Sequence, residues 1–142
     1  MKPRILMIEN DRDDRYLTEE MFAMEGFEAE LDFIFSHELL NYTTSHSEIP
    51  HLVILDLSSG PYRNYEKIRE IRSTAGYESV PVIVLSNTAE NEEIDQSYKM
   101  GANSFIKKPG DYPDTLFKIS NFIKYWFKVV ELPQPQRTDV KM

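Results

Sequence analysis

Two short runs of consecutive apolar residues constrain the fold of this chain more than any other feature. Residues 52–55 read Leu-Val-Ile-Leu and residues 82–85 read Val-Ile-Val-Leu, and each run is bounded by polar or turn-forming residues. Runs of this length and composition are typical of strands that are covered on both faces of a parallel sheet. Parallel strands need crossover connections, which are usually helices. We therefore expect an α/β fold.

Strand-like and helix-like patterns alternate five times along the chain. The strand patterns cover residues 4–8, 29–35, 52–56, 82–85 and 104–106, and a helical spacing of apolar residues follows each of them. Short connections favour right-handed crossovers and helices on both faces of the sheet. The first, third and fourth strands are the most apolar, so they belong inside the sheet, and the mixed second and fifth belong near its edges. We predict a flavodoxin-like, doubly wound (βα)5 sandwich with a parallel five-stranded sheet of order 2-1-3-4-5.

Polar residues predict where three of the helices begin. Asp11 and Asp111 precede helical patterns, and aspartate is a preferred N-cap residue. Asn87, followed three residues later by a glutamate, resembles a capping box. Asp13 and Asp14 then fall in the first turn of the first helix, where we expect solvated carboxylates that favour the helix dipole.

Length, charge and composition exclude several classes of protein. The 142 residues fit one domain over residues 1–130, followed by an extended tail over residues 131–142 that contains two prolines. There is no cysteine, which excludes a disulfide framework, a zinc-thiolate site and thiol redox chemistry. The net charge of -8 argues against binding to nucleic acid or to an anionic membrane surface. No apolar run reaches the roughly 18 residues of a membrane span, and we expect a cytoplasmic protein.

Polar side chains end four of the predicted strands. Glu9 and Asn10 follow the first strand, Asp56 ends the third, Ser86 follows the fourth and Lys108 follows the fifth. Because the carboxyl ends of parallel strands meet at one edge of a sheet, these side chains should converge there. Adjacent acidic and amide oxygens suit Mg²⁺, and a hydroxyl and an ammonium added to them suit phosphoryl transfer.

The same segments resemble the receiver domains of two-component response regulators over essentially the whole ordered length of the chain. The matching pieces are residues 5–10, 53–57, 82–86 and 101–109. The resemblance implies that Asp56 accepts a phosphoryl group from a histidine kinase. It also implies a Mg²⁺ ion held by Glu9, Asn10, the carboxylate of Asp56 and the backbone carbonyl of Ser58. The protein would then be a phosphoacceptor switch and not a conventional enzyme, since it would catalyse only its own phosphorylation and dephosphorylation.

The family resemblance also implies how the phosphoryl group is sensed. Ser86 would bond a phosphoryl oxygen and Lys108 would pair with it, while Phe105 would swing inward and alter the surface formed by the fourth helix, fifth strand and fifth helix. On an ordinary interpretation Phe105 is simply a core residue.

One position departs from the family pattern. The family usually has a second acid where this chain has Asn10, and an amide oxygen lacks the charge of a carboxylate. We expect weaker metal binding in consequence, unless a shift of one residue lets Asp11 compensate.

Residues 122–133 resemble the extended last helix of single-domain regulators that partner bacterial phytochrome-type kinases. Aromatic residues lie on more than one side of this segment, which motivates the hypothesis of a homodimer through the last helix, with a downstream protein as the further partner.

Two alternatives remain from the residues alone. One is a receiver-like adaptor in which Asn10 impairs phosphorylation and which acts by constitutive protein binding. The other is a phosphatase with an aspartyl nucleophile, although that chemistry usually needs a second aspartate where this chain has Ser58. We interpret His37, His46 and His51 as surface or structural residues, because they show no metal-ligand spacing.

Overall fold

The computed structural model describes residues 2–45, 48–57 and 65–135. Five parallel strands form one sheet of order β2-β1-β3-β4-β5, which confirms the predicted topology. The strands are β1 (Arg4–Ile8), β2 (Glu30–Ile34), β3 (Leu52–Asp56), β4 (Val82–Ser86) and β5 (Ser104–Lys107).

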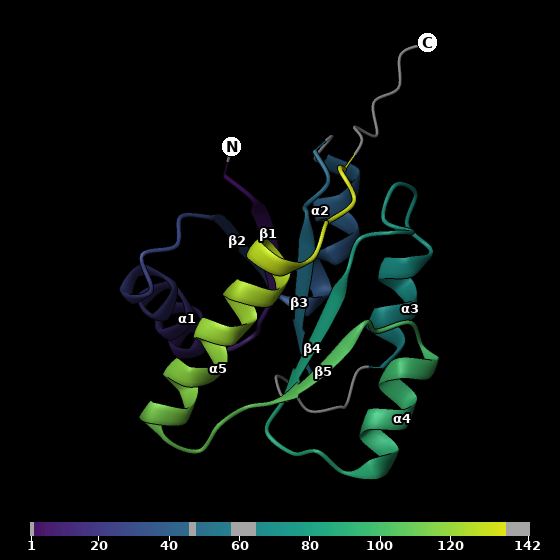
Figure 1. The fold of residues 1–142 in the computed structure, drawn as a ribbon. Helices are drawn as coiled ribbons and strands as arrows, with labels where there is room; N and C mark the ends of the chain where they lie inside the picture. The colour runs from purple at the N-terminus through teal and green to yellow at the C-terminus, as the bar shows by residue number, and fades with distance from the viewer. Residues whose placement is uncertain (1, 46–47, 58–64, 136–142) are drawn as a thin grey trace.

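Helices cover both faces of this sheet. They are α1 (Arg12–Met24), a 3-10 turn η1 (Ser36–Glu38) that continues into α2 (Leu39–Ser45), α3 (Glu66–Arg72), α4 (Asn91–Lys99), α5 (Tyr112–Lys124) and a π-helical turn η2 (Tyr125–Val129). In Figure 1, α1 and α5 lie on one side of the sheet, and α2, α3 and α4 lie on the other. In the part of the chain that is described, no helix is both long and apolar enough to cross a membrane.

The two apolar runs in the sequence divide between two cores. Alternate residues of a strand point to opposite faces, so each run supplies side chains to both sides of the sheet. Val53, Leu55 and Val84 pack in the core that includes residues of α3, and Ile54 and Ile83 pack in the core that includes residues of α1 and α5. All five are at most 4% exposed. Burial on both faces explains why these strands are continuously apolar.

The structure confirms two of the predicted helix caps. The carboxylate of Asp11 accepts hydrogen bonds from the backbone N–H groups of Asp13 and Asp14, at 2.8 and 3.2 Å. Asp111 accepts one from the backbone N–H of Asp114 at 2.9 Å. Each bond satisfies a donor that the first helical turn leaves without an intrahelical partner.

The predicted cap of α4 is wrong by three residues. The helix begins at Asn91 with Glu90 as its N-cap, and the capping box pairs Glu90 with Glu93 where we expected Asn87. The reason lies in the burial of Glu93, which is 3% exposed and needs donors. The backbone N–H of Glu90 donates to its carboxylate at 2.9 Å, and the hydroxyl of Thr88 donates at 2.7 Å.

His51 is a structural residue at the start of β3. It is 7% exposed, its ring Nδ1 accepts a hydrogen bond from the backbone N–H of Arg4 at 3.0 Å, and its backbone N–H donates to the backbone carbonyl of Arg4 at 2.8 Å. Burial, and secondarily the charge of Arg4, lowers the pKa of His51. The folded protein therefore holds this imidazole neutral at a pH where an unfolded chain would protonate it.

This lowered pKa predicts that stability falls as the solution becomes mildly acidic. Below the ordinary histidine pKa of about 6.5 the unfolded chain binds a proton that the folded chain does not, so the free energy of unfolding decreases from about pH 7.5 to about pH 5.5. Urea unfolding over this range should show a smaller decrease in H51N, whose amide oxygen can still accept from Arg4. The matched control H37N changes an exposed histidine and should behave as the wild type. Equal pH dependence in H51N and the wild type would contradict the assignment.

Candidate functional site

The strand ends predicted to converge do meet at the carboxyl edge of the sheet, and the side chains of Glu9, Asp56 and Lys108 lie together there. Glu9 follows β1, Asp56 ends β3, Ser86 ends β4 and Lys108 follows β5. The strand register keeps these ends level, pairing Ile8 with Leu55, Asp56 with Leu85 and Ser86 with Lys107. Backbone hydrogen bonds continue past the strands, from the N–H of Lys108 to the carbonyl of Ser86 at 2.7 Å.

Lys108 compensates buried negative charge at this edge. The side chains of Glu9 and Asp56 are fully buried, and carboxylates cannot stay charged there without a partner. The ammonium of Lys108 forms an ion pair with Oδ2 of Asp56 and lies 3.9 Å from Oε1 of Glu9 and 3.1 Å from Oδ2 of Asp14. Burial alone lowers the pKa of Lys108, but Asp56, Glu9 and Asp14 outweigh burial, so the pKa is raised and the ammonium stays charged.

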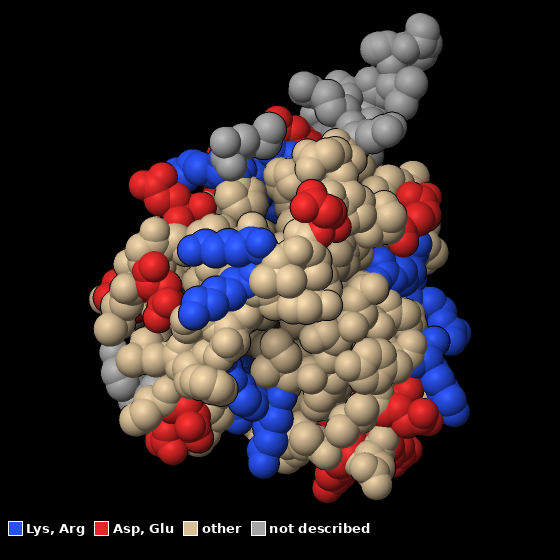
Figure 2. All heavy atoms as spheres, in the orientation of Figure 1, with Lys and Arg blue, Asp and Glu red and all other residues tan. Residues whose placement is uncertain are grey.

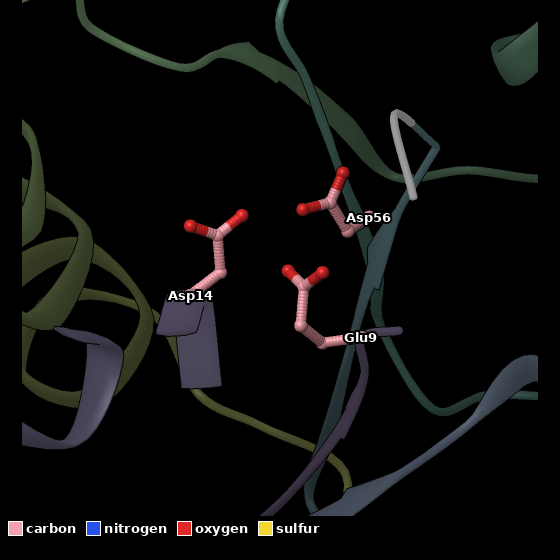
Figure 3. Close-up of side chains that lie close together, drawn as sticks. All are labelled: Glu9, Asp14 and Asp56. Atoms are coloured by element: carbon pink, nitrogen blue, oxygen red, sulfur yellow. The ribbon is translucent and has the colours of Figure 1, made fainter. Parts of the chain in front are cut away.

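Asp14 is the site residue that sequence reasoning missed. We expected a solvated first-turn residue, and Asp14 does lie in the first turn with its side chain 42% exposed, but its carboxylate also bonds the ammonium of Lys108, which we did not predict. Figure 3 shows the carboxylates of Glu9, Asp14 and Asp56 facing one another, each from a different element. One oxygen from each lies within 4.8 Å of the others. A signal for it was present in the sequence, because Asp14 lies seven residues before Met21 and the helical period therefore places it on the face of α1 that the buried Met21 and Phe22 occupy, whereas Asp13 falls off that face.

The three carboxylates make a donor set that fits a hard divalent cation. Mg²⁺ prefers carboxylate oxygens together with water, and it offsets the repulsion between acids that share a site. Glu9 and Asp56 were predicted as ligands, and the structure brings both of them into this group. The carbonyl of Ser58, predicted as a further ligand, lies outside the described residues.

The side chain of Asn10 does not join the other two predicted ligand side chains, Glu9 and Asp56. Its amide oxygen accepts from the backbone N–H of Ser36 at 2.8 Å, and its amide nitrogen donates to the hydroxyl of Ser36 at 3.0 Å. Both ends of the amide are thus used to hold the connection after β2, and a ligand role for Asn10 stays a prediction. The carboxylate of Asp11 caps α1, and compensation by Asp11 likewise stays a prediction.

Ser86 is connected to α4 through hydrogen bonds that pass by way of Thr88. It is fully buried, and its hydroxyl oxygen accepts from the backbone N–H of Thr88 at 3.3 Å. Thr88 in turn donates to the buried carboxylate of Glu93 on α4. A displacement of the Ser86 hydroxyl would therefore disturb the start of α4.

Phe105 lies on β5, where it is partly buried. Its ring packs against the core on the side of the sheet that α3 covers, which matches its ordinary interpretation as a core residue. Its backbone N–H donates to the hydroxyl of Tyr98 on α4 at 3.2 Å. The predicted inward movement of its ring stays a prediction.

Proteins similar to this chain include response regulators. Rcp1 from Synechocystis is 24% identical over 135 residues, which cover 91% of this chain and 92% of Rcp1. The crystal structure of its Mn²⁺-bound form superposes with a TM-score of 0.81, at 22% identity, with 93% of this chain and 99% of that chain covered.

Two further solved structures have the same fold. The regulator RPA3017, described in red light signaling of R. palustris, gives a TM-score of 0.83 at 24% identity, with 93% of this chain and 99% of that chain covered. The phosphorylated cyanobacterial phytochrome response regulator RcpA gives 0.84 at 23%, with 94% and 100% covered. A family model described as the response regulator receiver domain matches residues 5–120. With the sheet order, the convergence of Glu9, Asp56 and Lys108 and this match, the chain belongs to the response regulator receiver domain family of two-component signalling.

Proposed function

We propose that this protein is a single-domain response regulator in which Asp56 accepts a phosphoryl group from a histidine kinase. The observation that carries the proposal is the ion pair between Lys108 and the buried carboxylate of Asp56, with Glu9 beside it. A buried acid at a strand end, paired with a cation and adjacent to other acids, is costly for stability and is typical of functional sites.

The chemistry requires a nucleophile, a cation and a hydroxyl. An oxygen of Asp56 attacks phosphorus, the bond from phosphorus to the donor nitrogen breaks, and that nitrogen keeps the electron pair and takes a proton from solvent. Lys108 can then donate to one phosphoryl oxygen, and Ser86 can donate to another. Mg²⁺ would be held by Glu9, Asn10, Asp56 and the carbonyl of Ser58. Its positive charge would offset the negative charge on the phosphoryl oxygens. The protein would catalyse only its own phosphorylation and dephosphorylation.

The output would be a change in protein contacts. Movement of Ser86 toward the phosphoryl group would pull on Thr88, and the bond from Thr88 to Glu93 connects this movement with α4. Inward rotation of Phe105 would change the adjoining surface of α4, β5 and α5. A phytochrome-type kinase as partner is supported by the similarity to RcpA and RPA3017.

We also propose a homodimer through α5 and η2. Three large apolar side chains on this segment are exposed, Phe117 at 68%, Tyr125 at 51% and Val129 at 66%. A helix that buried a single apolar stripe against the sheet would leave less apolar surface in contact with solvent. Figure 2 shows an extended uncharged area on the face where α5 lies, with Lys and Arg side chains beside it. Sedimentation at tens of micromolar should show a dimer, and F117E/V129E should shift it to monomer. A wild type that stays monomeric contradicts this contact.

The phosphorylation itself is tested with acetyl phosphate and Mg²⁺. Intact-mass measurement should show a gain of one phosphoryl group, peptide mapping should locate it to Asp56, and EDTA should prevent it. A chain that gains no mass from acetyl phosphate or from a cognate kinase would contradict the proposal and favour the constitutive adaptor.

A further inference from the structure

Three aspartates open α1, and only one of them faces the site. Asp11 caps the helix with its carboxylate, and Asp13 is exposed. Asp14 lies in the same first turn, but its Oδ2 is 3.1 Å from the ammonium of Lys108. Its carboxylate points toward Glu9 and Asp56, as Figure 3 shows. The direction of this side chain is therefore specific to Asp14 and is not a general property of an acidic first turn.

Asn10 leaves this site one carboxylate short of the usual number for its family. Its amide is held at both ends by Ser36, and any metal bond would have to share the amide oxygen with the backbone N–H that already donates to it. An amide also brings no negative charge to balance a divalent cation. Asp14 offers both missing properties, an oxygen within 4.8 Å of the other two carboxylates and a negative charge.

The position of Asp14 allows it to bind a cation at little cost. Its side chain is 42% exposed, whereas those of Glu9 and Asp56 are fully buried. A partly solvated carboxylate costs less to keep charged before the cation binds than a fully buried one does, and it can rotate to meet the cation. It is attached to the first helical turn, so its backbone is fixed relative to the edge of the sheet by the cap at Asp11.

We propose that Asp14 supplies the third carboxylate of the metal site, as a ligand of the divalent cation in place of the acid that Asn10 replaces. This inference rests on the proposed function, because that function requires the cation. Asp14 would then carry the negative charge that Asn10 lacks, from a position four residues further along the chain, in the first turn of α1. The binding of metal is then expected to depend on Asp14 more strongly than on Asn10.

The inference is tested by calorimetric titration of the full chain with Mn²⁺ alone. D14N should weaken Mn²⁺ binding at least about tenfold, a loss in the range seen when groups that support a metal site are removed. The matched control D13N changes an exposed acid in the same turn and should stay within about twofold of the wild type at the same ionic strength. Circular dichroism of each variant confirms that the fold is retained. Equal affinities of D14N and D13N would overturn the assignment.

A double substitution tests whether Asp14 is a metal ligand or only adds negative charge near the site. N10D restores the usual acid and should strengthen Mn²⁺ binding, and D14N should then cost clearly less in the N10D background than in the wild type, because one carboxylate replaces the other. Equal losses in both backgrounds would show that Asp14 acts independently and would overturn the proposal. A wild type that binds no Mn²⁺ and gains no phosphoryl group contradicts the proposed function as well. If the wild type is phosphorylated and D14N binds Mn²⁺ as tightly as the wild type, only the role of Asp14 is contradicted.

Discussion

Replacing Asp56 by asparagine is expected to abolish phosphoryl labelling. The carboxylate oxygen is the nucleophile, and an amide of the same shape is too weak a nucleophile to form the bond to phosphorus. Acetyl phosphate and Mg²⁺ should label the wild type, and intact-mass measurement of D56N should show at least about a 100-fold lower labelled fraction, a loss typical when the group that makes the reactive bond is removed. The substitution keeps the volume of the side chain, so the sheet edge should remain packed.

Further variants test whether Asp56, and not a neighbouring acid, is the phosphoryl acceptor. D13N removes an exposed acid of α1 and should label as the wild type does. Label that persists in D56N and maps to Glu9 or Asp14 would show that the acceptor is a different member of the carboxylate cluster. Label that persists at scattered surface positions would show that acetyl phosphate reacts without a specific site.

Replacing Lys108 by methionine is expected to lower the free energy of unfolding by about 3 kcal/mol. The substitution removes the cation shared by Asp56, Asp14 and Glu9, so the two buried carboxylates of Glu9 and Asp56 lose the ammonium that compensates their charge. Breaking a buried ion pair in this way costs about 3 to 5 kcal/mol, and the lower end applies because the Lys108 side chain is 20% exposed and water can reach it. Urea unfolding at neutral pH measures the loss.

The same variant should label slowly. Lys108 is the cation placed to meet a phosphoryl oxygen, and the loss of one such donor slows a reaction by roughly 100-fold. Millimolar Mg²⁺ should restore part of the lost stability, because a divalent cation supplies charge to the same carboxylates. K107M is the matched control, since Lys107 is the adjacent exposed lysine on β5, and it should change stability by no more than about 0.5 kcal/mol. A K108M protein as stable as K107M would contradict the view that Lys108 balances the cluster.

The fold was predictable from local sequence patterns because the pattern of apolar residues indicates which strands are buried. The runs at residues 52–55 and 82–85 are apolar on both faces, and only strands inside the sheet are covered on both faces. That rule placed β3 and β4 correctly and put the mixed strands β2 and β5 at the edges, as the sheet order shows. Convergence of Glu9, Asp56 and Lys108 followed from the same reasoning, since parallel strands bring their carboxyl ends to one edge.

Helix starts were predictable only where the capping residue acts locally. Asp11 and Asp111 bond backbone N–H groups two or three residues away, and a short sequence window contains that interaction. The start of α4 depends instead on Glu93, whose burial against the sheet makes it take donors from Thr88 and Glu90. The sequence window around Asn87 contains no sign of that burial, and the predicted cap was wrong for this reason.

By itself, the sequence determined the sheet order, the edge at which the site forms and the identity of three of its charged residues. Only the tertiary structure decided that Asp14 faces the site, that Asp13 does not, and that Asn10 turns to Ser36. The physical reason is that periodicity specifies which residues share a helix face, whereas the rotation of α1 about its own axis is set by packing against β1, β3 and α5. A carboxylate in the first turn favours the helix dipole whichever way it points, so local energetics are the same for Asp13 and Asp14, and the docking of the apolar face of α1 decides which of them reaches Lys108.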